Sequence, residues 1–164
     1  MKIIVLSDTH LSNENQQLPF RLLQKLDQAD MIIHAGDWIS RHVLDMLQTY
    51  APVKGVHGNV DGAEIINTFP EKVLLTVHGF RIGIVHGHGS GKTTERRAFD
   101  AFADEDVDVD AIIFGHSHIP YLRYFKKVLM LNPGSPTDKR TQPYFSFAVL
   151  HLEENIRAEF VFFE

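Results

Sequence analysis

The stretch Met1-Lys-Ile-Ile-Val-Leu-Ser-Asp-Thr-His10 opens the chain and decides its fold. Lys2 to Leu6 is a short apolar, β-branched run of the kind that forms a buried strand, and it stops at Asp8 and His10. A second run from Met31 to Ile33 ends in the same way, at His34-Ala35-Gly36-Asp37. Between the two runs, leucines recur at helical spacing, at Leu18, Leu22, Leu23 and Leu26. The chain therefore begins β-α-β, which predicts a mostly parallel sheet.

Further along, the pattern changes from alternating strands and helices to hairpins. Helical spacing recurs at residues 43–47, a strand is predicted at 53–56, and a helix is predicted at about 93–103. Strand pairs separated by turn residues are predicted at 73–77 with 81–85, 121–125 with 128–131, and 144–152 with 156–162, and one more buried strand at 112–114. This order predicts an α/β fold with two packed mixed β-sheets flanked by helices, a four-layer sandwich. No repeat or linker interrupts the sequence, so we expect a single domain over residues 1–164.

Composition excludes several classes of protein. With 44% hydrophobic and 23% charged residues, the 164-residue chain is an ordinary globule, neither disordered nor a coiled coil. It has no cysteine, so His, Asp, Glu and Asn are the strong metal ligands that remain. The net charge of −5 argues against a broad nucleic-acid-binding face. The unusual feature is the number of histidines, which is ten.

The N-terminal apolar run is too short for a signal peptide or a membrane span, because Ser7 and Asp8 follow Leu6 at once. We therefore expect a cytoplasmic protein with no membrane partner.

Five polar clusters follow directly on predicted strands. In open α/β sheets, ligands bind beyond the carboxyl ends of the strands, where neighbouring loops converge. Each cluster brings an oxygen or imidazole donor, and most have a glycine beside it: Asp8-Thr9-His10, Gly36-Asp37, Gly58-Asn59-Val60-Asp61, His86-Gly87-His88 and Gly115-His116-Ser117-His118. Joint occurrence of such donors at strand ends indicates a metal or catalytic site.

The spacing within two clusters favours metal binding. Asp8 and His10 are two residues apart, as are His116 and His118, so in an extended segment each pair points the same way. This mixture of nitrogen and oxygen donors suits a first-row divalent metal such as Mn, Fe, Co, Ni or Zn. Asp37 stands alone after its strand, and its two oxygens make it the natural bridge between two ions. Taken singly, Asp37 or Asn59 would more simply be a turn or helix cap.

In this order, the five clusters resemble the motif series of calcineurin-like metallophosphoesterases, over Met1 to about Ser135. The short chain and Asn132-Pro-Gly-Ser135 resemble the small bacterial and archaeal phosphodiesterase branch. The resemblance implies a metallophosphoesterase sandwich and a binuclear centre, with Mn as the first choice of metal. It implies one ion on Asp8, His10, Asp37 and His118, and a second on Asp37, Asn59, His86 and His116.

The implied activity is that of a metal-dependent phosphoric ester hydrolase. A metal-bridging hydroxide would attack phosphorus in a small phosphoester, with a diester favoured over a monoester. Many family members have a catalytic histidine where this chain has Val60, although members of the small branch also lack it. His88 is our candidate for the catalytic acid, with His57 as a weaker one, and Asn59 is placed with the catalytic residues as well as with the ligands.

Two other functions compete with this interpretation. The retromer scaffold subunit resembles the same small branch and uses the fold as a non-catalytic protein-binding platform, but it carries Asp where this chain has Asn59. A nuclease would use the same metal chemistry, yet Lys and Arg total 16 against 21 acidic residues, and we find no stretch that joins basic and stacking aromatic residues. We therefore expect a small phosphoester substrate and no stable nucleic-acid binding. Aromatic residues beyond core needs near the C-terminus, such as Phe162, suggest a homodimer or higher homo-oligomer.

Overall fold

The computed structural model describes residues 1–104 and 108–164 and contains two five-stranded mixed sheets. The first sheet has the order β10-β9-β1-β2-β3. Its strands are β1 (Lys2–Leu6), β2 (Met31–His34), β3 (Val53–Gly55), β9 (Phe145–Leu152) and β10 (Ile156–Phe163). Strands β1, β2 and β3 are parallel, with Ile3 opposite Met31, and β9 pairs with β1 in the antiparallel sense. The sequence predicted the parallel start, and the C-terminal hairpin makes the sheet mixed.

The second sheet has the order β4-β5-β6-β8-β7. Its strands are β4 (Lys72–Val77), β5 (Phe80–Val85), β6 (Ala111–Ile113), β7 (Tyr121–Phe125) and β8 (Val128–Asn132). The predicted hairpins form β4 with β5 and β7 with β8, and β6 lies parallel to both β5 and β8. β7 and β4 are therefore the edge strands of this sheet.

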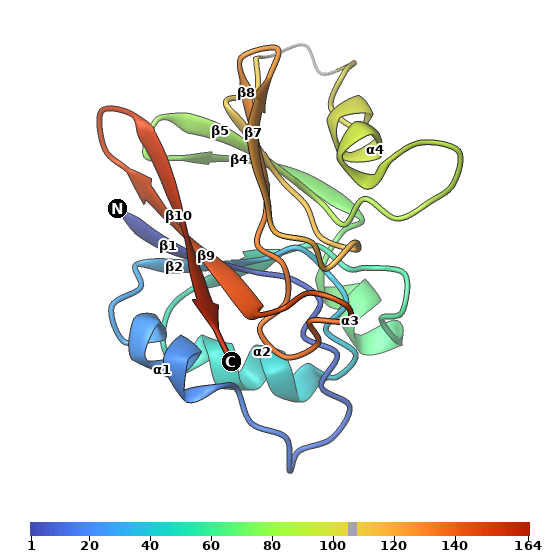
Figure 1. Ribbon diagram of the computed structural model, residues 1–164, viewed down its shortest axis with the longest axis vertical. Helices are drawn as coiled ribbons and strands as arrows, with labels where there is room; N and C mark the ends of the chain where they lie inside the picture. The colour runs from blue at the N-terminus through green and yellow to red at the C-terminus, as the bar shows by residue number, and fades with distance from the viewer. Residues whose placement is uncertain (105–107) are drawn as a thin grey trace.

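The helices cover the outer faces of the two sheets (Figure 1). They are α1 (Phe20–Leu26), α2 (Arg41–Gln48), α3 (Ala63–Thr68) and α4 (Thr94–Asp100). Buried side chains of α1, α2 and α3 pack with the first sheet, and Ala98 of α4 packs with the second. The sequence signal for α3 is too weak to predict this helix, because its six residues present one fully buried apolar side chain, Ile65. The predicted fold class is confirmed.

The main core lies between the sheets, and period-two alternation of side chains builds it. Ile3 and Val5 of β1 face the other sheet, whereas Ile4 and Leu6 face the helices. All four are fully buried, and each contributes about 1.5–3 kcal/mol relative to an exposed side chain. From Ile3 to Leu6 both faces of β1 are therefore apolar, and the next polar side chains, from Ser7 on, come in the loop beyond its carboxyl end.

The C-terminal hairpin divides its aromatic residues between core and surface. Phe147 of β9 is fully buried, whereas Phe162 of β10 is 51% exposed and lies beside Tyr144, which is 46% exposed. Phe162 is thus an apolar side chain beyond core needs, as expected. Among the residues described, no helix has the length and apolar character needed to cross a membrane.

Candidate functional site

Two groups of three ligand-type side chains lie at the carboxyl ends of the strands. Asp8, His10 and His118 form the first, and Asp37, His86 and His116 form the second. Within each group the ligand atoms lie within 4.8 Å of one another. These six residues come from the loops after β1, β2, β5 and β6, so the site draws on both sheets.

Asp37 contacts both groups. Its Oδ2 lies 3.2 Å from Nε2 of His86, in its own group, and 3.6 Å from Nε2 of His10, in the other. Asp8 Oδ1 lies 3.4 Å from Nε2 of His118 and 3.9 Å from Nε2 of both His10 and His86. The two carboxylates therefore lie between the imidazoles, in positions from which one carboxylate could serve two ions.

The imidazoles are held so that Nε2 points into the site. Nδ1 of His86 donates to the carbonyl oxygen of Ala35 at 2.7 Å, and Nδ1 of His118 donates to that of Asp138. Because a carbonyl only accepts, each Nδ1 carries the proton and each Nε2 is left with its lone pair. Among the residues that the structure describes, Nε2 of His86 and of His10 has no hydrogen-bond partner, and both atoms are buried. Buried polar atoms are seldom left in this state, so the donor set fits divalent metal ions.

Backbone geometry at the ligands is left-handed, which corrects the extended-segment argument. Asp8, His10, Asp37, His116 and His118 all have positive φ, between 48° and 66°. A non-glycine residue in this region costs about 1 kcal/mol or more, and such strain concentrates at functional sites. The members of the pair His116 and His118 accordingly enter different groups. Tight turns, and not strand alternation, aim these side chains.

Glycines in the clusters allow the loops of the two sheets to approach. Gly36 has φ +98°, and a Cβ on it would lie 2.8 Å from Nδ1 of His86. A Cβ on Gly115 would lie 1.8 Å from Oγ of Ser7. A side chain at either position would clash with these atoms, which is why the second and fifth clusters have glycine there.

Asp61 fixes the loop that carries Asp37, and the sequence analysis gave it no role. Its Oδ1 accepts the backbone N–H groups of Trp38 at 2.7 Å and Ile39 at 2.8 Å. Its Oδ2 accepts those of Gly58 at 2.7 Å and Asp37 at 3.0 Å. The sequence signal was present, because Asp61 belongs to the third polar cluster, but only the fold shows that it joins the loops after β2 and β3.

Side chains of the Asn132-Pro-Gly-Ser135 segment form hydrogen bonds to the loops after β1 and β6. Ser135 Oγ donates to the carbonyl oxygen of Asp8 at 2.7 Å, and Asn132 Nδ2 donates to that of Gly115 at 2.8 Å. Ser135 Oγ also accepts the N–H of Asp138, whose carbonyl orients His118. This motif therefore positions ligands.

Charged neighbours outweigh the effect of burial on the pKa of some site residues, whereas burial prevails at others. Burial alone would raise the pKa of Asp37, but contact with His86 and the N–H of Val60 outweigh it and lower the pKa to about 2. Burial would lower the pKa of His10 and of His86, but the carboxylates raise both. Burial and then the charge of His86 lower the pKa of His88 and of His116. Asp37 is therefore ionised at neutral pH, as a ligand must be.

The two other predicted site residues lie at the rim. Asn59 is exposed, but its loop reaches the site because the N–H of Val60 donates to Asp37 Oδ1 at 3.2 Å. The half-buried ring of His88 lies 5.7 Å from that of His86 and 6.4 Å from that of His116. The Nδ1 atom of His88 is buried and has no hydrogen-bond partner within residues 1–104 and 108–164.

His34, at the end of β2, has a structural role. It is fully buried, stacks on Trp38 at 3.7 Å and accepts the N–H of Gly36 at Nδ1. Its proton therefore lies on Nε2, which donates to Thr9 Oγ1 at 3.1 Å. Burial, as the largest cause, lowers the pKa of His34 well below 6.5.

This depressed pKa predicts a pH-dependent contribution of His34 to stability. Below about pH 6.5 the unfolded chain binds a proton that folded His34 resists, so the contribution is full above this pH and is lost as pH falls. The loss amounts to at most about 1.4 kcal/mol per pH unit. We expect urea unfolding to show that the stability difference between wild type and His34→Gln shrinks from about pH 7.5 to about 5.5. A difference that stays constant would contradict this prediction.

The comparisons with known proteins agree with the fold class and with the predicted superfamily. A family model described as the calcineurin-like phosphoesterase superfamily domain matches residues 1–155, so the chain belongs to this superfamily. It is 36% identical over 165 residues to a probable metallophosphoesterase from Methanothermobacter thermautotrophicus, covering 98% of this chain and 92% of the relative. The family implies divalent metal ions, and the two groups at the strand ends are the candidate positions for them.

Two solved structures share the fold. Vps29 from Entamoeba histolytica superposes with a TM-score of 0.77 at 24% identity, over 100% of both chains. A protein described as a novel archaeal phosphodiesterase superposes with a TM-score of 0.75 at 21% identity, over 99% of this chain and 100% of the other. At these identities the similarity establishes the architecture alone.

Proposed function

We propose that this protein is a phosphodiesterase that hydrolyses small phosphodiesters with two divalent metal ions, Mn²⁺ first among them. The observation that carries the proposal is the pair of ligand groups that Asp37 and Asp8 both contact, with the Nε2 lone pairs of His86 and His118 turned toward these carboxylates. Asp8, His10, Asp37 and His118 would hold one ion, and Asp37, Asn59, His86 and His116 the other. The scaffold alternative has no use for such a donor set.

When bound, two divalent ions supply positive charge for the phosphoryl oxygens and lower the pKa of water near them. The residues of the chain supply the remainder of the chemistry. Ala35 and Asp138 fix the rings of His86 and His118, so the ligands need little reorganisation. Asp37, with its depressed pKa, stays ionised and balances the charge of the ions. His88 stands beside both His86 and His116, where it can donate a hydrogen bond to the substrate.

Metal removal and replacement test the proposed function. We expect protein stripped with chelator to lose activity toward a bis-aryl phosphodiester, and Mn²⁺ to restore it more fully than Mg²⁺, Ni²⁺ or Zn²⁺. Aryl monoester and cyclic nucleotide, assayed in parallel, test the diester preference. Absence of hydrolysis in protein shown by elemental analysis to hold two ions would favour the protein-binding platform.

His88 is expected to matter most when the leaving group is poor. We expect His88→Ala to lower kcat about 100-fold on a diester with an alkyl leaving group, the usual contribution of a positioned acid, and much less on an aryl diester. His78→Ala is a matched control, since His78 lies exposed in the turn between β4 and β5, and it should leave both rates unchanged. Equal losses on both diesters would remove His88 from the role of proton donor.

A further inference from the structure

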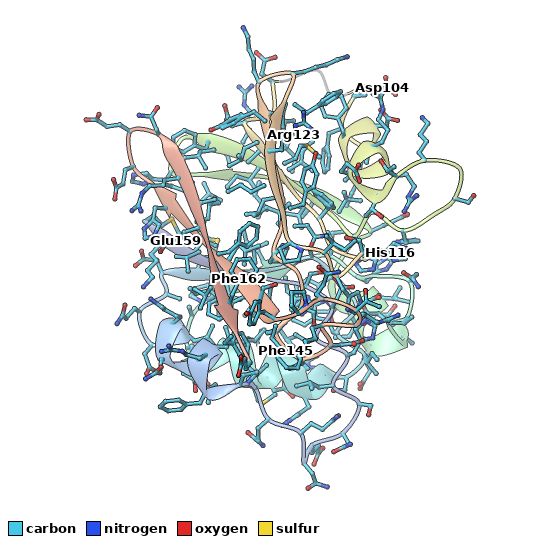
Figure 2. All side chains as sticks on the ribbon, in the orientation of Figure 1. Asp104, His116, Arg123, Phe145, Glu159 and Phe162 are labelled. Carbon is cyan, nitrogen blue, oxygen red and sulfur yellow. The ribbon has the colours of Figure 1, made fainter. Side chains whose placement is uncertain are left out.

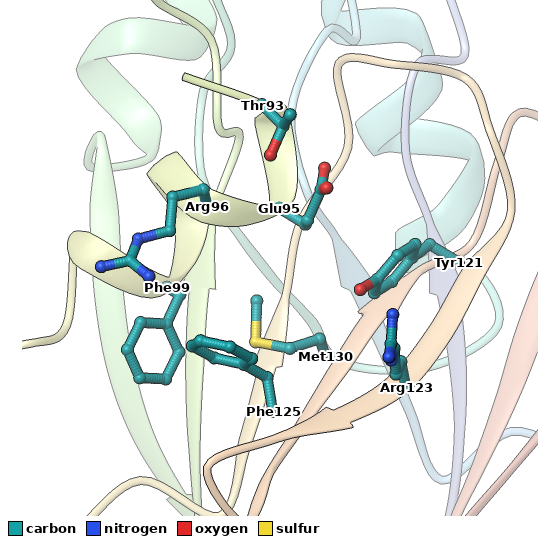
Figure 3. Close-up of a pocket in the computed structure, with 8 residues that line it drawn as sticks. All are labelled: Thr93, Glu95, Arg96, Phe99, Tyr121, Arg123, Phe125 and Met130. Atoms are coloured by element: carbon teal, nitrogen blue, oxygen red, sulfur yellow. The ribbon is translucent and has the colours of Figure 1, made fainter.

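A pocket of about 350 Å³ lies on the outer face of the second sheet, between α4 and the edge strand β7. Figure 3 shows residues of α4 and the segment before it on one side and residues of β7 on the other. Its walls and floor are formed by Thr93, Glu95, Arg96, Phe99, Tyr121, Arg123, Phe125 and Met130. None of these residues belongs to the two ligand groups. The volume is that of a small-molecule site.

Both walls of the pocket begin at loops that carry site histidines. On the α4 side, Arg97 Nε donates to the carbonyl oxygen of Gly87, between His86 and His88, at 2.8 Å. On the β7 side, Tyr121 pairs with Asn132, whose Nδ2 donates to Gly115 and to Ser117. Tyr121 follows His118 by three residues, so their Cα atoms are at most about 11 Å apart. The end of the pocket at Tyr121 is therefore the end nearer to His118 in the chain, and Figure 2 shows where Arg123 of the pocket and His116 of the second ligand group lie.

The floor of the pocket offers faces for a flat ring. Met130 is buried, and Phe125 is 37% exposed and contacts Phe99 with a ring separation of 4.7 Å. The guanidinium of Arg96 lies 5.9 Å from the ring centre of Phe99 and 5.8 Å from that of Phe125. Aromatic and guanidinium planes of this kind stack with nucleobases.

The two arginines and the one glutamate that line the pocket favour an anionic ligand that also carries hydroxyl or amino groups. Two arginines face one glutamate, although the whole chain has a net charge of −5. Arg96 already pairs with Asp100 at 2.9 Å, whereas Arg123 has no ion-pair or hydrogen-bond partner in the described part of the chain. Arg123 is therefore free to bind a phosphate, and the carboxylate of Glu95 can accept from a ribose hydroxyl.

The fold also corrects one premise of the sequence analysis. We found no stretch that joins basic and stacking aromatic residues, and the tertiary structure assembles such a surface from two segments. Arg96 and Phe99 come from α4, and Tyr121, Arg123 and Phe125 come from β7.

We propose that the α4–β7 pocket binds a ribonucleotide, as the non-reacting half of a dinucleotide-type phosphodiester whose scissile phosphate lies at the metal centre. The base stacks on Phe125, beside the perpendicular ring of Phe99, the ribose contacts Glu95, and the terminal phosphate contacts Arg123. The hydrolysis of a dinucleotide-type diester rests on the proposed function. The binding of a ribonucleotide rests on the pocket alone.

Calorimetric titration of the metal-loaded protein with AMP, adenosine and inorganic phosphate tests the ligand. We expect AMP to bind at least tenfold more tightly than adenosine. Arg123→Ala is expected to weaken AMP at least fivefold and adenosine little. Phe125→Leu is expected to weaken both at least fivefold, because stacking is worth roughly 1–3 kcal/mol per base. The matched control is Arg157→Ala, an exposed arginine on the edge strand β10, which should leave AMP affinity unchanged.

Hydrolysis measured in parallel separates this inference from the proposed function. We expect the ratio of kcat/KM for a diadenosine diester that carries a terminal 5′-phosphate to that for a bis-aryl diester to fall at least fivefold in Arg123→Ala. AMP affinity that neither pocket variant changes would overturn the pocket, even in an active enzyme. AMP binding that Arg123→Ala weakens, in a protein that hydrolyses no diester, would support the pocket and count against the proposed function.

Discussion

Asp37→Asn is expected to release metal from both positions at once and to lower kcat/KM at least about 100-fold, or about 2.7 kcal/mol of transition-state stabilisation. Asp37 Oδ2 contacts His86 in one group and His10 in the other, and its pKa of about 2 keeps it ionised. Asparagine keeps the size and the oxygen that accepts the N–H of Val60 but removes the charge. The number of bound ions, measured by elemental analysis after dialysis, should fall from two to fewer than one.

A matched control for this change is Asp45→Asn. Asp45 lies exposed on α2 and pairs with Arg41 at 3.2 Å, a surface contact worth less than about 1 kcal/mol. This variant should keep both ions and full activity. Two tightly bound ions in Asp37→Asn would contradict a shared carboxylate, and loss of a single ion would assign Asp37 to one position.

Asp61→Ala is expected to give the largest loss of stability, about 3 kcal/mol or more. Four backbone N–H groups, those of Asp37, Trp38, Ile39 and Gly58, would lose their acceptor together. Each buried donor left without a partner costs about 1–3 kcal/mol unless water reaches it. Urea unfolding of the metal-free protein measures this loss directly.

The same variant tests whether Asp61 positions the metal site or only stabilises the fold. Because its acceptors hold the loop of Asp37 in the left-handed conformation, metal affinity should also fall, by about 10- to 100-fold. Asp61→Asn keeps part of the acceptor capacity and should lie between wild type and alanine in both measurements. Unchanged metal affinity alongside lowered stability would limit Asp61 to a structural role.

The sequence predicted the elements whose signals are local. The apolar run of Lys2–Leu6, the helical spacing of α2 and the hairpin turns between the antiparallel strands each depend on neighbours in the chain. α3 has a single buried apolar side chain, and its six residues carry too little periodicity to be recognised. The four-layer fold then followed from the order of strands and helices.

The candidate site was found from the sequence because its donors follow strands, and parallel strands bring their carboxyl ends to one edge. By itself, the sequence determined the superfamily and the fold class, and it predicted the donors of the candidate site. Only the tertiary structure decided how these donors are aimed. Asp8 and His118 are 110 positions apart in the chain, and backbone turns with positive φ bring them to 3.4 Å.

Two further features depended on contacts between distant segments. Asp61 forms hydrogen bonds to the loop after β2, which lies more than twenty residues earlier in the chain. The α4–β7 pocket lies between a helix that precedes β6 in the chain and a strand that follows it. Local propensity carries no information on such pairings, since they form only when burial of the three apolar clusters brings the segments together.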